Sequence, residues 1–126
     1  DAHVALRRKM YEFYVDLFKD IEAITDFTVP NTDYFANYWL SAILIEPNKA
    51  KGIDREALRL AFEAANIESR PLWKPMHLQP IFEQYPYYGS NVAETLFEKG
   101  LCLPSGSNLT DEERVRIKKV VFDFFK

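Results

Sequence analysis

The sequence predicts an α+β fold, a two-layer sandwich in which helices cover one face of a small sheet. Helical patterns, with apolar residues three or four positions apart, alternate with short apolar runs of strand length. Short strands separated by helices are typical of such a sandwich. At 126 residues with 48% hydrophobic content, residues 1–126 fit one domain that buries its core without disulfides.

The first elements along the chain are a helix and a buried strand. Residues 3–21 are predicted to be helical, because their apolar residues form one stripe. The stripe consists of Leu6, Met10, Phe13, Leu17 and Ile21. Residues 26–37 are rich in turn formers and indicate a connection with room for a short strand. Residues 38–45 are apolar on both alternating faces, which predicts a strand buried from both sides.

A second helix and strand follow. Asp54 is expected to cap a helix that reaches about Asn66, since a carboxylate accepts hydrogen bonds from the free N–H groups of the first turn. The inward residues of this helix are Leu58, Ala61, Phe62 and Ala65. Residues 67–72 then fit a short strand that ends at a proline-rich segment.

The third helix is expected to begin at a cap formed by Ser90 or Asn91. Its apolar residues are Val92, Leu96 and Phe97. Gly100 is predicted to end it as the left-handed residue after the last turn. Residues 101–103 then form a brief buried strand.

The last helix has a complete start signal. Thr110 and Glu113 have the spacing of a capping box, in which each side chain bonds the backbone N–H of the other residue. The acidic residues of this first turn complement the helix dipole, so they need no catalytic role. The inward face of the helix comprises Ile117, Val120, Val121 and Phe124.

Composition and charge exclude several classes of function. A net charge of −3 argues against a nucleic-acid-binding module, which would carry a basic stripe. The basic run at residues 7–9 is followed by Glu12 and Asp16, a pattern typical of a solvated helix face. The sequence contains no apolar stretch of the ~20 residues that cross a membrane, and no signal peptide. The single cysteine, Cys102, fits a reducing, cytoplasmic setting.

The residues that carry metal or nucleophilic chemistry do not cluster. His3 and His77 lie far apart, and Cys102 has no second cysteine, so the sequence predicts no metal site and no disulfide. Cys102 lies between two leucines, where a buried structural thiol is expected. Residues 105–107 resemble a phosphate loop only loosely, and a turn before a helix accounts for them.

The segment NIESRPLWKPMHLQPIFEQYPYY, residues 66–88, has the most unusual composition. It holds four of the seven prolines, five aromatic residues and one of the two histidines. Prolines exclude a central strand, because each removes a ladder donor. One interpretation is a rigid surface for an anionic ligand that contains a ring. The other is a crossing loop whose aromatic residues pack inward, and composition alone favours this second interpretation.

Four stretches together resemble the C-terminal domain of the DegT/DnrJ/StrS aminotransferases. They are GIDREALRLAFEAANIESRPLWKPMHLQPIFEQ at residues 52–84 and VAETLFEKGLCLPSGSNLTDEERVRI at 92–117, with ALRRKMYEFY at 5–14 and NYWLSAILI at 37–45. The likeness covers nearly the whole chain. It implies the small domain of a fold-type I pyridoxal-phosphate transferase, with a small and mostly antiparallel sheet.

The resemblance also implies an activity and partners. Members are pyridoxal 5'-phosphate enzymes that transfer an amino group, typically from glutamate, to a nucleotide-linked keto-sugar. The large domain that binds the cofactor and carries the Schiff-base lysine is expected to lie upstream of this sequence. Lys74 does not match the cofactor-lysine motif, so this fragment alone is expected to be inactive. The parent enzyme is expected to be a homodimer.

In this resemblance the WKPMH stretch borders the active site and touches the sugar nucleotide. Substrate contact is carried over to Trp73, Lys74, Pro75, Met76, His77 and Arg70. Lys74 can meet phosphate or sugar oxygens as a point charge, and His77 can hydrogen-bond a sugar hydroxyl or carbonyl. Arg70, at a strand end, could instead hold the segment to its own domain.

Two alternatives to the aminotransferase stay open. The family includes dehydratases that use the same cofactor without a Schiff-base lysine, and the position that separates them lies outside this sequence. A non-catalytic, stand-alone binding module of the same fold is the second alternative. An exposed apolar face where the partner domain sat, with residues 74–88 mobile or held by a neighbouring molecule, would favour the enzyme fragment. A polar surface all round would favour the module.

Overall fold

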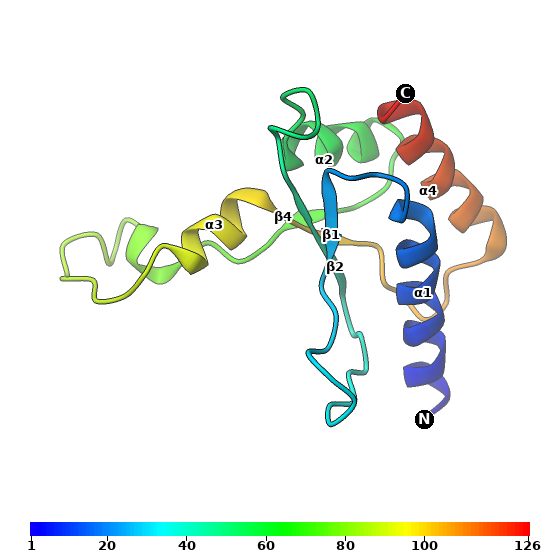
Figure 1. Ribbon diagram of the computed structural model, residues 1–126, viewed down its shortest axis with the longest axis horizontal. Coiled ribbons are helices and arrows are strands. Elements are labelled where there is room, and N and C mark those ends of the chain that lie inside the picture. Colours follow the sequence, from blue (N-terminus) through cyan, green and yellow to red (C-terminus); the bar gives the residue numbers. More distant parts are fainter.

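A computed structural model describes all 126 residues and has the α+β architecture that the sequence predicts (Figure 1). The helices are α1 (Ala2–Phe18), α2 (Arg55–Ala64), α3 (Val92–Lys99) and α4 (Asp111–Phe124), with one 3-10 turn, η1 (Met76–Leu78). The strands are β1 (Ile24–Asp26), β2 (Ser41–Ile45), β3 (Arg70–Pro71) and β4 (Gly100–Leu103). None of the helices combines the length and apolar character needed to span a bilayer.

The four strands form one antiparallel sheet in the order β1-β2-β4-β3. The register pairs Ile43 with Leu101 and Pro71 with Leu101, so β4 lies between β2 and β3. Because β3 and β4 are neighbours, residues 72–99 leave the sheet and return to it at adjacent points.

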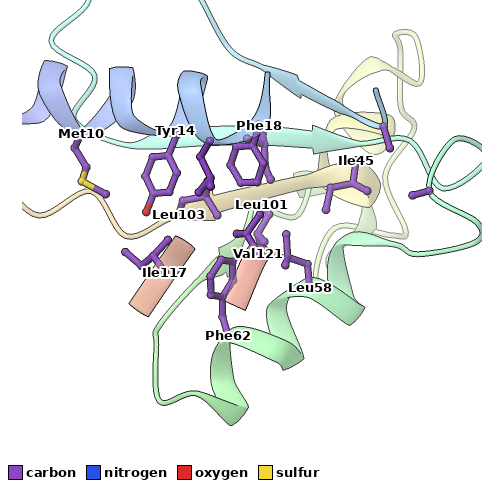
Figure 2. Close-up of a cluster of buried hydrophobic side chains, with 14 residues drawn as sticks. Met10, Tyr14, Phe18, Ile45, Leu58, Phe62, Leu101, Leu103, Ile117 and Val121 are labelled. Atoms are coloured by element: carbon purple, nitrogen blue, oxygen red, sulfur yellow. The ribbon is translucent and has the colours of Figure 1, made fainter. Parts of the chain in front are cut away.

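The core lies between one face of the sheet and the helices α1, α2 and α4. Figure 2 shows side chains from these three helices converging on Leu101 and Leu103 of β4. Its fully buried large side chains include Tyr14, Phe62, Leu58, Ile117 and Val121. Four of the inward positions predicted for α2 and α4 are confirmed as buried. They are Leu58 and Phe62 in α2, and Ile117 and Val121 in α4.

The inward stripe of α1 differs from the predicted one. Met10 and Leu17 are buried as expected, but Tyr14 and Phe18 take the other central places and Leu6 is exposed. Tyr14 tolerates burial because its hydroxyl donates to the Pro104 carbonyl at 2.8 Å, and burial raises the pKa of this hydroxyl. The helix ends at Phe18, so Ile21 lies beyond it, half-buried against the core.

The strand predicted over residues 38–45 is shorter and covered mainly on one side. β2 begins only at Ser41. Tyr38 has a left-handed φ of 46°, which does not fit a strand, and its ring stacks on that of Tyr11 with centroids 3.7 Å apart. Ser41, Ile43 and Ile45 are buried, whereas the residues that alternate with them are half-buried. The expectation of burial from both sides is therefore wrong for this strand.

Gly100 has a different role from the predicted one. Its backbone is extended, with φ −90° and ψ 136°, and it begins β4 instead of closing α3 in the left-handed region. A Cβ at this position would collide with the Leu72 side chain and the Leu96 carbonyl. Glycine is required here for close packing, not for its conformational freedom.

The predicted helix caps are confirmed at α2 and α4. Asp54 accepts a hydrogen bond from the Ala57 N–H at 2.8 Å. Thr110 and Glu113 form the reciprocal capping box at 3.2 and 2.8 Å. α3 instead has Asn91 as its N-cap residue, and this side chain makes no capping bond.

The predicted strand at 67–72 is reduced to Arg70–Pro71, after which the chain leaves the body of the molecule. Pro71 lacks an N–H donor, and only one further ladder bond follows, from the Leu72 N–H to the Gly100 carbonyl at 3.2 Å. Residues 73–99, here called the arm, then extend away from the sheet and carry η1 and α3 (Figure 1).

Candidate functional site

The sequence-predicted contact residues lie where the arm leaves the sheet. Arg70 is in β3 at the sheet edge, Trp73 and Lys74 follow it, and Met76 and His77 begin η1. Trp73, Lys74 and Met76 are exposed, whereas Pro75 and His77 are half-buried. We call residues 73–77 the strip.

Short-range hydrogen bonds hold the strip in a fixed turn. The Leu78 N–H donates to the Pro75 carbonyl at 3.1 Å, and the Gln79 N–H donates to the Met76 carbonyl at 2.9 Å. The Gln79 side-chain amide donates to the Lys74 carbonyl at 3.2 Å. Together with the fixed φ of Pro75, these bonds preorganise the strip without any ligand.

His77 joins the strip to α3. Its Nε2 lies 2.8 Å from Oε1 of Glu94, and its ring stacks on Tyr87 with centroids 3.7 Å apart. The Tyr87 hydroxyl donates in turn to the Ser90 carbonyl at 2.6 Å. The His77 side chain is only 17% exposed. This histidine therefore positions the arm with one ring nitrogen, which leaves only Nδ1 for a ligand.

Arg70 is an exposed cation that makes only a weak ion pair. It bonds Glu68 through Nε at 2.7 Å, and both side chains are more than 70% exposed. An exposed ion pair of this kind contributes roughly 0–1 kcal/mol, because water screens both charges. Arg70 is therefore free to exchange Glu68 for an anionic ligand.

A groove of about 770 Å³ opens at the β3 edge of the sheet, beside the strip. Its lining includes Leu40, Ser69, Arg70, Trp73, Cys102 and Arg116. We call it the edge groove. It brings Arg70 and Trp73 together, but residues 74–77 do not line it. Cys102 is buried as predicted, and burial raises the pKa of its thiol.

Sequence reasoning missed Trp39. It was placed in a buried strand, yet its side chain is 58% exposed and stacks on Trp73 with ring centroids 6.1 Å apart. The two residues come from the 27–40 loop and the arm, which are far apart in sequence. The chain has only two tryptophans, of which Trp39 follows the turn-rich residues 26–37 and Trp73 lies within the proline-rich residues 66–88.

Comparison with known proteins decides the family. A sequence model of the DegT/DnrJ/EryC1/StrS aminotransferase family matches residues 1–122. The chain belongs to this family. The relationship inferred from the WKPMH stretch and its flanks is thereby confirmed.

Individual members of the DegT/DnrJ/EryC1/StrS family extend this result. The chain is 32% identical over 129 residues to the putative pyridoxal phosphate-dependent aminotransferase EpsN of Bacillus subtilis (strain 168), covering 99% of this chain and 32% of that protein. It is 27% identical over 125 residues to GDP-perosamine synthase of Escherichia coli O157:H7, and this match covers 99% of this chain and 32% of that protein. The chain therefore spans about a third of the length of the curated relatives it matches.

A solved structure confirms the fold. The aminotransferase TlmJ from Streptoalloteichus hindustanus superposes with a TM-score of 0.80 at 19% identity, over 96% of this chain and 31% of that chain. At this identity the superposition establishes the arrangement of helices and strands. It agrees with the α+β sandwich that the sequence predicts.

The lining of the edge groove does not fit the cofactor of the family. Pyridoxal phosphate needs a lysine for its Schiff base and a carboxylate facing the pyridine nitrogen. No lysine lines the edge groove. Its Glu113 carboxylate is held by the capping box at the start of α4. We therefore derive no catalytic step through the cofactor from these residues.

Proposed function

We propose that residues 1–126 are the C-terminal small domain of a pyridoxal-phosphate-dependent aminotransferase. Its reaction is the transfer of an amino group, from glutamate, to a nucleotide-linked keto-sugar. Support comes from the family match over residues 1–122 and from relatives about three times as long as this chain. The cofactor and its Schiff-base lysine belong, in this proposal, to the part of the enzyme outside these residues.

The strip is proposed as one wall of the sugar-nucleotide pocket. The observation that carries this proposal is that the strip is both rigid and exposed. Its turn is closed by three hydrogen bonds, yet Trp73, Lys74 and Met76 stay open to solvent. A fixed and solvated set of apolar and cationic groups can bind a ligand without first paying the entropy of ordering a loop.

Each side chain of the strip has a proposed task. The Lys74 ammonium meets diphosphate or sugar oxygens, and Met76 with Pro75 contacts the apolar face of the sugar. His77 offers Nδ1 to a sugar hydroxyl or carbonyl while Nε2 stays with Glu94. Arg70 exchanges Glu68 for an anionic group of the substrate.

The cofactor, when bound, supplies the electron sink for the amino transfer. The residues of this chain then have the tasks of binding the sugar nucleotide, orienting it and excluding water. We also propose a homodimeric, cytoplasmic enzyme. The exposed large apolar side chains of the arm support an interface, because a monomeric surface seldom leaves so many uncovered. Those outside the strip include Ile81, Tyr85 and Tyr88.

An assay of the intact enzyme tests the proposal. It supplies glutamate, pyridoxal phosphate and a panel of keto-sugar nucleotides, and it measures the amino-sugar product. We expect activity from the intact enzyme and neither activity nor a cofactor absorbance band from residues 1–126 alone. Removal of a sugar hydroxyl with no amino-sugar product would instead identify a dehydratase. Binding without any turnover by the intact protein would indicate a non-catalytic module.

Within that assay, His77→Ala tests the strip. We expect a higher KM for the sugar nucleotide or a lower kcat, because the substitution removes Nδ1 and loosens the turn. An unchanged KM and kcat, within about twofold, would contradict the role given to His77. The matched control is Phe122→Ala, an exposed aromatic residue of α4, outside the strip and the edge groove.

A further inference from the structure

The two tryptophans form an exposed aromatic pair between segments that are distant in sequence. Their rings lie 6.1 Å apart between centroids with an interplanar angle of 28°, and they remain 58% and 67% exposed. Burying both indoles would stabilise the chain, so leaving them near each other in solvent needs a reason. A planar ligand that covers them would supply one.

The backbone around Trp39 is fixed from two sides. The Arg7 guanidinium donates to the Trp39 carbonyl and, at 3.1 Å, to the Ser105 carbonyl. The Trp39 N–H donates to the Asn37 side chain at 3.1 Å. Since α1 carries Arg7, the loop is fastened to the rigid sandwich. The backbone that carries the Trp39 ring is therefore held in one place.

Trp73 is fixed in the same way. Pro71 precedes it in the sheet, and the Leu72 N–H bonds the Gly100 carbonyl at 3.2 Å. Pro75 follows it and begins the closed turn of η1. The backbone at both tryptophans is thus held in place, and their rings stack on each other, so a ligand meets a largely preformed surface.

The charged side chains that line the edge groove beside this pair are equal in number and opposite in sign. Arg70 pairs with Glu68, and Arg116 donates to the Ala65 carbonyl at 2.8 Å. Glu113 accepts from the Thr110 N–H at 2.8 Å. Two cations balance two carboxylates, so the groove does not select a polyanion. A neutral ring with hydrogen-bonding edges suits it better.

The groove also offers a free polar atom. The Ser69 hydroxyl is buried in its lining and has no hydrogen-bond partner within the chain. A buried hydroxyl without a partner costs free energy, which a ligand recovers when it bonds that hydroxyl. The carbonyl and amino edges of a nucleobase can accept from it or donate to it.

From these observations we propose that Trp39 and Trp73 form the stacking platform for the nucleobase of a nucleoside diphosphate. The edge groove takes the polar edge of that base. This assignment rests on the proposed function, and it adds Trp39 as a residue that binds the substrate. Stacking on an aromatic side chain is tolerant of base identity, so Ser69 and the groove supply the selectivity.

Calorimetric titration of the intact protein tests the platform. The probes are UDP, TDP and GDP, with inorganic pyrophosphate as the probe that lacks a base. We expect Trp39→Ala and Trp73→Ala each to weaken binding of the preferred nucleoside diphosphate about 5- to 150-fold. Trp39→Phe should keep most of the affinity, and pyrophosphate binding should not change. Phe122→Ala, an exposed aromatic residue outside the edge groove, is the control.

Several results would overturn the platform. They are equal losses of diphosphate and pyrophosphate binding, no binding of any nucleoside diphosphate, or a lower melting temperature with unchanged affinity. The last result would mean that another part of the protein covers the two rings. The proposed reaction is tested separately. Amination of a sugar nucleotide with unchanged binding in both variants refutes the platform alone, and tryptophan-dependent binding without amination refutes the reaction alone.

Discussion

The sandwich and the arm use aromatic residues in opposite ways. In the sandwich, Tyr14 and Phe62 are almost completely buried and contact side chains from three helices and the sheet. In the arm, Tyr88 is 88% exposed, and no residue of α3 is buried. Apolar burial therefore stabilises the sandwich, whereas the arm depends on hydrogen bonds and local stacking around His77. The first region maintains the fold, and the second presents a surface.

The largest expected difference between the two regions comes from matched aromatic truncations. Phe62→Ala should cost about 3–5 kcal/mol of unfolding free energy, because it leaves a cavity in a core that cannot close around it. Tyr88→Ala in the arm should change it by less than about 0.5 kcal/mol. Urea denaturation measures both. Similar losses in the two variants would mean that the arm is part of the cooperative core.

His77→Ala should raise the amide exchange rates of the arm without raising those of the sandwich. The substitution removes the bond to Glu94 and the stack on Tyr87. A hydrogen bond to a charged group contributes about 1.5–3 kcal/mol, so amides of η1 and α3 should exchange roughly 10- to 150-fold faster. Amides of β2 and β4 should keep their protection. Hydrogen exchange followed residue by residue measures this, and Tyr85→Ala is the control within the arm.

The helix caps give a smaller contrast. Thr110→Ala should cost about 1 kcal/mol, because the Thr110 hydroxyl accepts from the Glu113 N–H at the start of α4. Asn91→Ala should cost less than half of that, since its side chain makes no capping bond at α3. Thermal unfolding of the two variants compares them directly. Equal losses would contradict the assigned difference in capping.

The smallest effect is expected at Asp123, on the surface of α4. Hydrogen bonds from Lys119 and Lys126 hold the pKa of this carboxyl at about 2, below its ordinary value. A lowered folded-state pKa contributes stability that is complete above about pH 4 and disappears as the pH falls towards 2. Asp123→Asn should remove this part of the acid dependence. Acid titration of unfolding by circular dichroism measures it, and an unchanged acid limb would refute the pairing.

Elements with local causes were predictable from the sequence. Asp54 and Thr110 cap their helices through residues three positions away, so their spacing alone predicts both caps. The buried run at β4 and the apolar stripe of α4 are equally local. The strip was also found from its sequence, through a family likeness that the comparison confirms, although its contacts with substrate stay a prediction.

Features with distant causes were not predictable. Gly100 is required by Leu72, which lies 28 positions earlier and packs where a Cβ would be. Tyr14 is acceptable in the core because of the Pro104 carbonyl, which no helical pattern reveals. Trp39 was assigned to a strand because its neighbours are apolar, and only its approach to Trp73 shows that the ring faces solvent.

The pairing of Pro71 with Leu101 has a further consequence. β3 and β4 are adjacent antiparallel strands, so the arm is the long loop of a β-hairpin. The backbone pairing of the two strands holds both ends of this loop in the sheet. Residues can be added or removed near Tyr88 and Gly89 without shifting the sheet register or opening the core. The tip of the arm can thus change in length while the strip and the sheet keep their places.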